Sequence, residues 1–505
     1  MPSLDFKGKA FVYAHHLTVP FRELVPDAKK SCLPKSTVPA LDGNLIIHGD
    51  NLHALKALLP LYAGKVDCVI IDPPYNTGNE GWCYNDNVRS PIAKEWLKKA
   101  SPVDREDLER HDKWASMMWP RLKLLHELMA EDGVIFVSID DNEIHRLRAL
   151  MDEIFGEGGF AAQITVLCNP KGRVLSEGFA DTHEYALVYT KYDHRGDFSS
   201  AKSEELIERE YTLLDENDDR YREMELRNTH REFNRETRDK MWFPLFADPK
   251  TGKVAVESGK GLVEVLPIWD DGLEGCWTWG RKKAALESEI LVAHQVKNRW
   301  KIYRRDYAKG SRRKATTVWN SPEVQSEKGQ AAFEEVMNTR FPHPPKAIGL
   351  IEKFLQIGAH REALVLDSFG GSGTTAHAVL AQNKKDHGKR RFIIVECEDY
   401  ADSITAERVR RVILGYPFKG TKRTELMRET FNWKKLKKAE ELVEKAESVE
   451  KLEGADYDEV KITVEAGELV VTGEMTIKDK APGIPGAFTY CTLGAEMSLE
   501  GLLTG

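Results

Sequence analysis

The most regular feature of the chain is an alternation of short apolar runs with longer segments whose apolar residues recur at helical spacing. Residues 43–75 read NLIIHGD, NLHALKALLPLY and VDCVIID in turn, which predicts strand, helix and strand. The same rhythm continues to about residue 190 and returns from residue 347 to residue 397. Such alternation is typical of an α/β domain with a mainly parallel sheet.

The rhythm is lost between residues 195 and 335, and we interpret this region as an inserted domain. Its first part, residues 203–242, is dense in charge and predicts helix. We predict that two halves of one α/β domain, residues 43–194 and 336–416, flank the insertion. Residues 1–42 should be irregular, and residues 417–505 should add a helix and a β hairpin. A chain of 505 residues is long enough for several domains.

The composition narrows the class of protein. An apolar content of 41% and a charged content of 30% indicate a globular protein. No apolar run is long enough to cross a membrane, and the first residues lack the pattern of a secretion signal. The seven cysteines are scattered without a CxxC pair, so neither a disulfide framework nor a metal site is expected. A reducing cytoplasm is the simplest location.

Charge is distributed unevenly along the chain. The net charge is −8, yet residues 281–314 hold twelve Lys or Arg and three acids, with Trp277, Trp279, Trp300, Tyr303 and Tyr307 in or beside them. Basic residues interleaved with aromatics suit phosphate contact plus stacking of the aromatic rings on nucleic acid, although a solvated charged face is an equally simple explanation. The candidate DNA contacts are Arg281, Lys282, Lys297, Arg299, Arg304, Arg305, Arg312 and Arg313.

A glycine-rich turn follows the predicted strand near residue 365, in the sequence VLDSFGGSGTTAHA. Gly371 and Gly373 fit a turn that lets backbone approach a nucleotide-like cofactor, and Glu396 ends the next strand, where an acid can bind ribose hydroxyls. The turn alone does not separate a nicotinamide enzyme from one that uses S-adenosylmethionine. Asp367 favours the second, because an acid there can meet a cationic ligand but would repel a pyrophosphate.

A second motif, Asp72-Pro73-Pro74-Tyr75, ends the predicted strand VDCVIID. Prolines cannot donate to a strand ladder. The Asp72 carboxylate and the Pro73 carbonyl could therefore accept the two N–H groups of an exocyclic amine, while Tyr75 stacks on the base. The alternative is a proline-rich strand end with an incidental acid.

Taken together, the motifs resemble a known family. HGDNLHALKALLP, IIDPPYNTGNEGWCYNDN, DGVIFVSIDDNE, THEYALVYTK, FPHPPKAIGLIEKFL and LDSFGGSGTTAHAV are similar to segments of β-type, permuted DNA amino-methyltransferases. Modification subunits of type III restriction-modification systems and adenine-specific relatives belong to that group. The resemblance covers most of residues 43–416. It implies a Rossmann-like, S-adenosylmethionine-dependent methyltransferase sheet with an inserted target-recognition domain.

The resemblance also implies roles for individual residues. The catalytic residues would be Asp72, Pro73, Pro74 and Tyr75, and the cofactor-binding residues Asp367, Phe369, Gly371, Ser372, Gly373, Thr374, Glu396, Asp50 and Lys346. Asp50 would lie near the cofactor adenine, although it is placed equally well to cap a helix. Lys346 would lie near the methionine carboxylate. His183 is expected to be structural, and Trp82 and Tyr84 could line the base pocket or simply pack in their loop.

The implied activity is methyl transfer from S-adenosylmethionine to adenine N6 in duplex DNA, by base flipping and direct transfer. Cytosine N4, an RNA substrate, a nicotinamide oxidoreductase and a non-catalytic DNA-recognition subunit are the alternatives. The expected partners are double-stranded DNA, a second copy of the chain and a restriction subunit, with no membrane and no metal.

Overall fold

The computed structural model describes residues 3–77, 109–172, 178–192, 196–202, 204–430, 439–465 and 468–497. The chain divides into two compact units. The first joins Met1–Phe198 to Ala315–Gly505, and the second is Ser199–Lys314. The second unit lies inside the region interpreted as an insertion, whereas residues 315–335 belong to the first.

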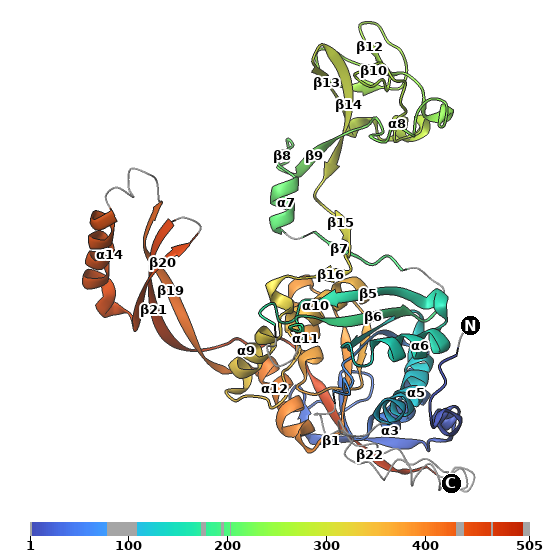
Figure 1. The fold of residues 1–505 in the computed structure, drawn as a ribbon, viewed down its shortest axis with the longest axis vertical. Coiled ribbons are helices and arrows are strands. Elements are labelled where there is room, and N and C mark those ends of the chain that lie inside the picture. The colour runs from blue at the N-terminus through green and yellow to red at the C-terminus, as the bar shows by residue number, and fades with distance from the viewer. Residues whose placement is uncertain are drawn as a thin grey trace. The chain divides into compact units, whose positions relative to one another are not determined.

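A ten-stranded mixed sheet forms the centre of the first unit (Figure 1). In spatial order its strands are β1 (Arg22–Cys32), β22 (Phe488–Glu496), β2 (Leu45–His48), β18 (Arg391–Glu396), β17 (Leu364–Asp367), β3 (Val66–Ile71), β4 (Met129–Ile139), β6 (Glu184–Thr190), β5 (Phe160–Val166) and β16 (Val318–Trp319). The run from β22 to β4 is parallel, and β6 is antiparallel to both of its neighbours. The predicted α/β class is therefore confirmed.

Helices cover both faces of this sheet. One core contains α3 (Asn51–Tyr62), α5 (Arg110–Leu128) and α6 (Ile144–Phe155); the other contains α9 (Ser326–Met337), α10 (Ile348–Gly358), α11 (Thr374–Asp386) and α12 (Glu407–Leu414). Figure 1 shows α3, α5 and α6 grouped on one side and α10, α11 and α12 on the other. Val69 and Ile71 enter the first core, and Cys68 and Ile70 the second. Because successive side chains of a strand point to opposite faces, burial on both explains the unbroken apolar run of β3.

Residues 1–42 are not irregular, which corrects the prediction for this segment. They contain α1 (Lys9–Val12), α2 (His15–Thr18) and the edge strand β1, which pairs antiparallel with β22. Pro26 is compatible with that strand because an edge strand tolerates a missing N–H. The same pairing means that β22 belongs to the central sheet and not to a C-terminal extension.

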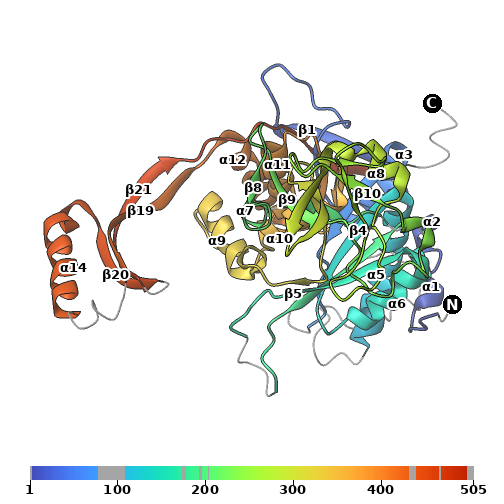
Figure 2. The same cartoon turned by 90° about the horizontal axis from the view of Figure 1, so that it is seen from above.

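The remaining C-terminal residues form the predicted helix and hairpin. Strands β19 (Pro417–Thr430), β21 (Glu468–Lys480) and β20 (Glu459–Glu465) make an antiparallel sheet in that order. Helix α14 (Ala439–Glu453) lies along this sheet (Figure 2). Ala446 of the helix packs with Met427, Leu469 and Val471 in a small core of their own.

The second unit is mainly β, so the helix expected over residues 203–242 is wrong for most of its length. Only α7 (Glu204–Glu210) forms an α-helix there, and β8 (Leu213–Leu214) and β9 (Arg220–Glu225) follow it. Strand β9 pairs with β14 (Arg299–Tyr307), which also pairs with β13 (Leu291–Val296). Strand β14 lies about eighty residues further along the chain, so no pattern in the residues near β9 predicts this strand. The unit also holds α8 (Arg281–Leu286) and the smaller strands β7 (Ser199–Ala201), β10 (Leu245–Ala247), β11 (Val254–Ala255), β12 (Val263–Val265) and β15 (Arg312–Lys314).

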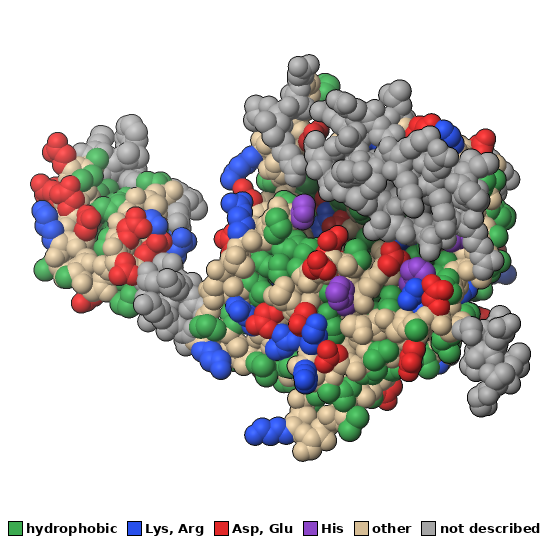
Figure 3. Space-filling view, turned by 90° about the horizontal axis from the view of Figure 1, so that it is seen from below, with side chains coloured by type: hydrophobic (Ala, Val, Ile, Leu, Met, Phe, Trp, Pro, Cys, Tyr) green, Lys and Arg blue, Asp and Glu red, His purple; other side chains and the backbone are tan. Residues whose placement is uncertain are grey.

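Two further observations concern the distribution of surface charge and the possibility of a membrane-spanning helix. On the face shown in Figure 3, acidic and basic side chains are interspersed. In the part of the chain that the structure describes, no helix combines the length and the apolar character needed to cross a membrane.

Candidate active site

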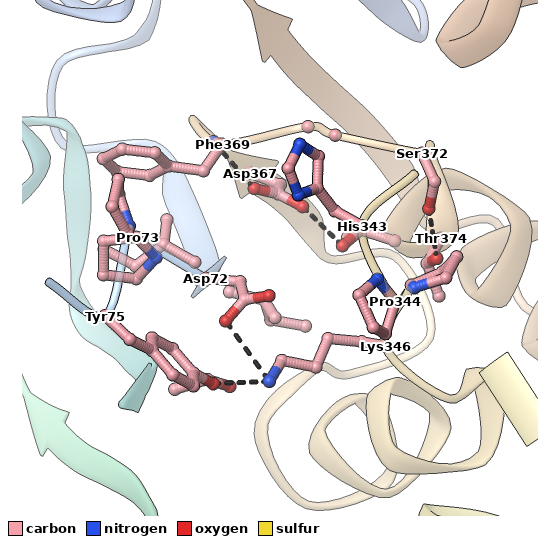
Figure 4. Close-up of a pocket in the computed structure, with 18 of the residues that line it drawn as sticks. Asp72, Pro73, Tyr75, His343, Pro344, Lys346, Asp367, Phe369, Ser372 and Thr374 are labelled. Carbon is pink, nitrogen blue, oxygen red and sulfur yellow. Dashed lines mark hydrogen bonds and ion pairs between the residues drawn. The ribbon is translucent and has the colours of Figure 1, made fainter. Parts of the chain in front are cut away.

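The two motifs meet at one edge of the central sheet. Strands β3 and β17 are parallel neighbours, with Cys68 opposite Val365 and Val69 opposite Leu366. Asp72 follows β3 directly and Asp367 ends β17, so both acids lie at the carboxyl edge, where open α/β sheets bind their ligands. A pocket of about 1510 Å³ opens there and is lined by residues of both motifs (Figure 4).

The end of β3 presents two acceptors to this pocket. The Asp72 side chain is 38% exposed and lines the pocket, whereas its Oδ1 is buried, accepts no hydrogen bond from the described residues and lies 3.4 Å from Nζ of Lys346. The Pro73 carbonyl also has no hydrogen-bond partner among the described residues. The Pro74 carbonyl differs, because it accepts a hydrogen bond from Nε1 of Trp114 at 2.6 Å. Trp114 on α5 thus holds the Pro74 carbonyl, while the Asp72 carboxylate and Pro73 line the pocket.

Tyr75, Lys346 and Glu184 form a hydrogen-bonded cluster beside Asp72. Figure 4 shows Tyr75, Lys346 and Asp72 of this group close together. Oε2 of Glu184 accepts from Oη of Tyr75 at 3.0 Å and from Nζ of Lys346 at 2.6 Å, and Lys346 also donates to the Tyr75 hydroxyl. Glu184 is the first residue of β6 and is buried. Sequence reasoning missed it, because a single acid at the start of a strand carries no pattern.

Electrostatics couple the members of this cluster. Burial raises the pKa of Asp72, and the Lys346 charge opposes that rise. Burial alone would lower the pKa of Lys346, but the charges of Asp72 and Glu184 outweigh it, so the net pKa is raised and the amine stays protonated. Lys346 contacts Asp72 and Tyr75, so its expected contact with the methionine carboxylate stays a prediction.

The end of β17 is a closed turn. Oδ1 of Asp367 accepts from the Phe369 amide at 2.9 Å and Oδ2 accepts from Oγ1 of Thr375 at 2.6 Å. Gly371 and Gly373 adopt φ of 49° and 77°, the left-handed region that favours glycine. A Cβ at Gly373 would also lie 3.0 Å from the Thr405 carbonyl oxygen. The turn therefore needs glycine, and it brings backbone to the pocket surface.

Two further acids predicted to bind the cofactor line the same pocket. Glu396 ends β18 and accepts from the amides of Gly371 at 2.6 Å and Glu398 at 2.9 Å. Asp50 caps α3 by accepting from the amides of Leu52 and His53 at 2.9 and 3.2 Å. Asp50 thus caps helix α3 and lines the pocket at the same time.

The charge of the pocket fits a cationic ligand. Nine acidic side chains and two Lys or Arg side chains line it. Burial raises the pKa of Asp367 to about 7, against the opposing hydrogen bonds from Thr375 and Phe369. Dinucleotides carry a pyrophosphate that these acids would repel, whereas the sulfonium and ammonium groups of S-adenosylmethionine would be attracted.

His183 lines the same pocket, whereas two other residues singled out from the sequence lie outside the described residues. A ring nitrogen of His183 lies 2.9 Å from the Tyr185 hydroxyl, which suits a structural role. Trp82 and Tyr84 fall in the range 78–108, outside the described residues.

The candidate DNA contacts are spread over the second unit. Arg281 and Lys282 begin α8, Lys297 and Arg299 lie at the β13–β14 turn, Arg304 and Arg305 lie on β14, and Arg312 and Arg313 lie on β15. Trp277 and Trp279 are buried in the core of this unit, so the suggestion that they stack on nucleic acid is wrong. Nε1 of Trp277 donates to the Phe243 carbonyl, which fixes that ring in the interior.

Comparison with known proteins identifies the family. The profile described as "DNA methylase" matches residues 66–407, which is more than half of the chain. The chain belongs to the DNA methylase family. Membership confirms the predicted Rossmann-like methyltransferase fold. It also resolves the choice of cofactor in favour of S-adenosylmethionine, for which the acid-rich pocket and the glycine turn are suited.

Relatives of this DNA methylase include a subunit of a type III restriction-modification enzyme and a type II methyltransferase. The EcoPI Mod subunit, a type III restriction-modification enzyme from Escherichia phage P1, is 36% identical over 380 residues, which cover 70% of this chain and 58% of the relative. The type II methyltransferase M.KpnI from Klebsiella pneumoniae is 33% identical over 350 residues, with 69% and 79% covered. The solved M1.HpyAVI–SAM complex is 15% identical, with a TM-score of 0.32 and 72% and 98% covered. The chain thus spans little more than half the length of the EcoPI Mod subunit.

Proposed function

We propose that this DNA methylase transfers a methyl group from S-adenosylmethionine to the N6 amine of adenine in duplex DNA. The observation that carries the proposal is the pair of acceptors that line the pocket at the end of β3, the partly exposed Asp72 carboxylate and the Pro73 carbonyl, next to the glycine turn. An exocyclic amine has two N–H groups, one for each acceptor. Holding both orients the nitrogen lone pair toward a methyl donor bound at the turn.

The residues around Asp72 support this chemistry by charge. Bound S-adenosylmethionine would supply an electrophilic methyl group. As the amine nitrogen forms its bond to the methyl carbon and the carbon–sulfur bond breaks, positive charge develops on nitrogen, and the ionised Asp72 stabilises it. The nitrogen then releases one proton, which the Asp72 carboxylate can accept. Lys346, 3.4 Å from Asp72, helps to keep this carboxylate ionised before the base arrives.

Adenine is favoured over cytosine by the resemblance, because DPPY motifs usually accompany adenine. Either base is stacked inside the duplex and must be flipped out to reach Asp72, at a loss of about a few kcal/mol in stacking and pairing. The Tyr75 ring, held through its hydroxyl by Glu184 and Lys346, is the stacking face that we assign to the flipped base.

The second unit is our candidate for recognition of the DNA sequence. Its basic residues would neutralise phosphates and set the register on the duplex. Replacing Arg281 and Lys282 by Gln should weaken the binding of all DNA sequences by about the same factor. It should also reduce the slope of log K against log salt concentration by about 1 to 2. An unchanged slope would remove α8 from the DNA contact. From the name of the EcoPI Mod subunit we also infer a restriction subunit as a partner. The family resemblance supports a homodimer, and the scattered cysteines support a cytoplasmic location.

The direct test uses purified protein, S-adenosylmethionine labelled in the methyl group and unmethylated genomic DNA. Nucleosides from the digested DNA are then separated by mass spectrometry, and sequencing of single molecules gives the modified site. We expect labelled N6-methyladenine. Label in N4-methylcytosine would overturn the choice of base. If the protein binds S-adenosylmethionine but leaves the DNA unlabelled, the proposed activity is wrong.

A further inference from the structure

A buried cation lies beneath the glycine turn without an acidic partner. Arg408 of α12 is 0% exposed, and no carboxylate of the described residues lies within ion-pair distance of its guanidinium. By contrast, Arg390, which is also buried, pairs with Asp386 at 2.9 Å. A charge buried without a counter-charge is strongly unfavourable, so the position of Arg408 calls for an explanation.

The guanidinium is directed at the turn. Nη1 donates to the Ser372 carbonyl at 3.2 Å, to Oγ of Ser372 at 3.1 Å and to Oγ1 of Thr374 at 2.8 Å. Nη2 lies 3.5 Å from Nδ1 of His377, whose pKa is lowered to about 3 by burial and by the Arg408 charge, so the ring is neutral. Nε is buried and has no hydrogen-bond partner.

These contacts determine what the two hydroxyls can offer to the pocket. Both oxygens accept from Arg408, and they lie 3.0 Å apart, so one hydroxyl donates to the other (Figure 4). The second hydroxyl then keeps a proton that can be donated only away from the guanidinium. Both side chains line the pocket. The thirteen-residue helix α11 also starts here, without a side-chain cap on its N-terminus, which adds partial positive charge.

We propose that Arg408 makes the Ser372–Thr374 end of the turn a subsite for a carboxylate, namely that of the amino-acid end of the methyl donor. Arg408 acts through the two hydroxyls and is a positioning residue, since it does not line the pocket itself. Asp367, in the same pocket, carries the opposite charge for the ammonium group of that ligand. The carboxylate compensates the charge of Arg408 when the ligand binds. The identity of the ligand rests on the proposed function.

The test is calorimetric titration of the full chain, without DNA, with S-adenosylhomocysteine and with the same molecule lacking its carboxylate. We expect wild-type protein to bind the carboxylate form roughly ten- to a hundredfold more tightly. Arg408→Met should bring this ratio close to one, and Arg408→Lys should restore part of it. The ratio isolates the carboxylate, because a turn that is merely loosened weakens both ligands alike. Arg390→Met is the matched control and should keep the wild-type ratio.

Two results would overturn the inference: equal binding of both ligands by wild-type protein, or a wild-type ratio in Arg408→Met. If Arg408→Met does not fold, the wild-type titration and the Ser372→Ala and Thr374→Val variants decide, and we expect a reduced ratio in both variants. Because no DNA is present, failure of this inference is distinct from failure of the proposed function. The latter would show as normal carboxylate discrimination without methyl transfer.

Discussion

The carboxyl ends of β3 and β17 are neighbours at one edge of the central sheet, but their polar groups are hydrogen-bonded in opposite ways. After β3 the chain places two prolines, and the partly exposed Asp72 carboxylate lines the pocket beside the Pro73 carbonyl, which accepts no hydrogen bond from the described residues. After β17 it places a glycine turn in which both oxygens of Asp367 are already bonded to the protein. Proline removes backbone donors, whereas glycine at positive φ allows the backbone to fold back and supply them.

The difference separates the two tasks of the pocket. Acceptors without a hydrogen bond from the protein suit the amine of the target base, which binds only for the reaction and develops positive charge during it. A turn whose polar groups are satisfied in advance suits a ligand that is held through the reaction. The β3 end should therefore govern the rate of transfer and the β17 end the affinity for the cofactor, and each prediction below tests that division.

Removal of the Asp72 carboxylate should have the largest effect. In Asp72→Ala the amine loses one acceptor and the developing charge loses its stabilising partner, so we expect single-turnover methyl transfer to fall roughly 10²- to 10³-fold. Rapid-quench measurement with labelled methyl donor checks this. A variant that keeps more than a tenth of the wild-type rate would remove Asp72 from the chemistry.

A side chain at Gly373 should act on binding. Gly373→Val forces a β-branched residue to φ of 77° and places its Cβ 3.0 Å from the Thr405 carbonyl oxygen, so the turn must shift. We expect cofactor affinity, measured by calorimetry, to fall at least about tenfold. Gly156→Val is the control for strain alone, since Gly156 has φ of 79° with open space around it and lies outside the pocket. Equal losses of affinity in both variants would refute a local effect.

Cofactor affinity should rise with pH. Burial raises the pKa of Asp367 to about 7, so below that pH the carboxyl is neutral and cannot attract an ammonium group. Affinity should therefore increase by up to about tenfold per unit between roughly pH 5 and 7 and then level off. Asp367→Asn should flatten the profile. Burial also raises the pKa of Glu143 to about 7, and Glu143 lies outside the pocket lining, so Glu143→Gln should leave the slope in place.

Glu184 should have the smallest effect, on rate. Glu184→Gln weakens the hold on Tyr75 and Lys346, so we expect kcat to fall about tenfold with cofactor affinity unchanged. Glu352→Gln is the matched control, because Glu352 accepts from Lys385 at 2.6 Å and lies outside the pocket. A change in cofactor affinity with kcat unchanged would show that Glu184 acts on cofactor binding and not on the rate of transfer.

Sequence alone predicted the features that are local in the chain. The strand–helix rhythm and both motifs depend on neighbouring residues, and the parallel sheet then brings Asp72 and Asp367 to one edge. The missed features depend on partners far apart in the chain, such as β1 with β22, or Tyr75 with Glu184. Arg408 was missed for the same reason, since its contacts at Ser372 and Thr374 are more than thirty residues away. Trp277 and Trp279 show the converse error, in which a local pattern of aromatics and charge conceals a buried core.

The measurement that tests the central claim most directly is the affinity of Asp72→Ala for S-adenosylmethionine, determined by calorimetry on the preparation used for the rate measurements. If the two strand ends have separate tasks, this affinity should stay within about threefold of wild type although methyl transfer is lost. A fall in affinity comparable to that of Gly373→Val would contradict the division between the reacting and the binding edge.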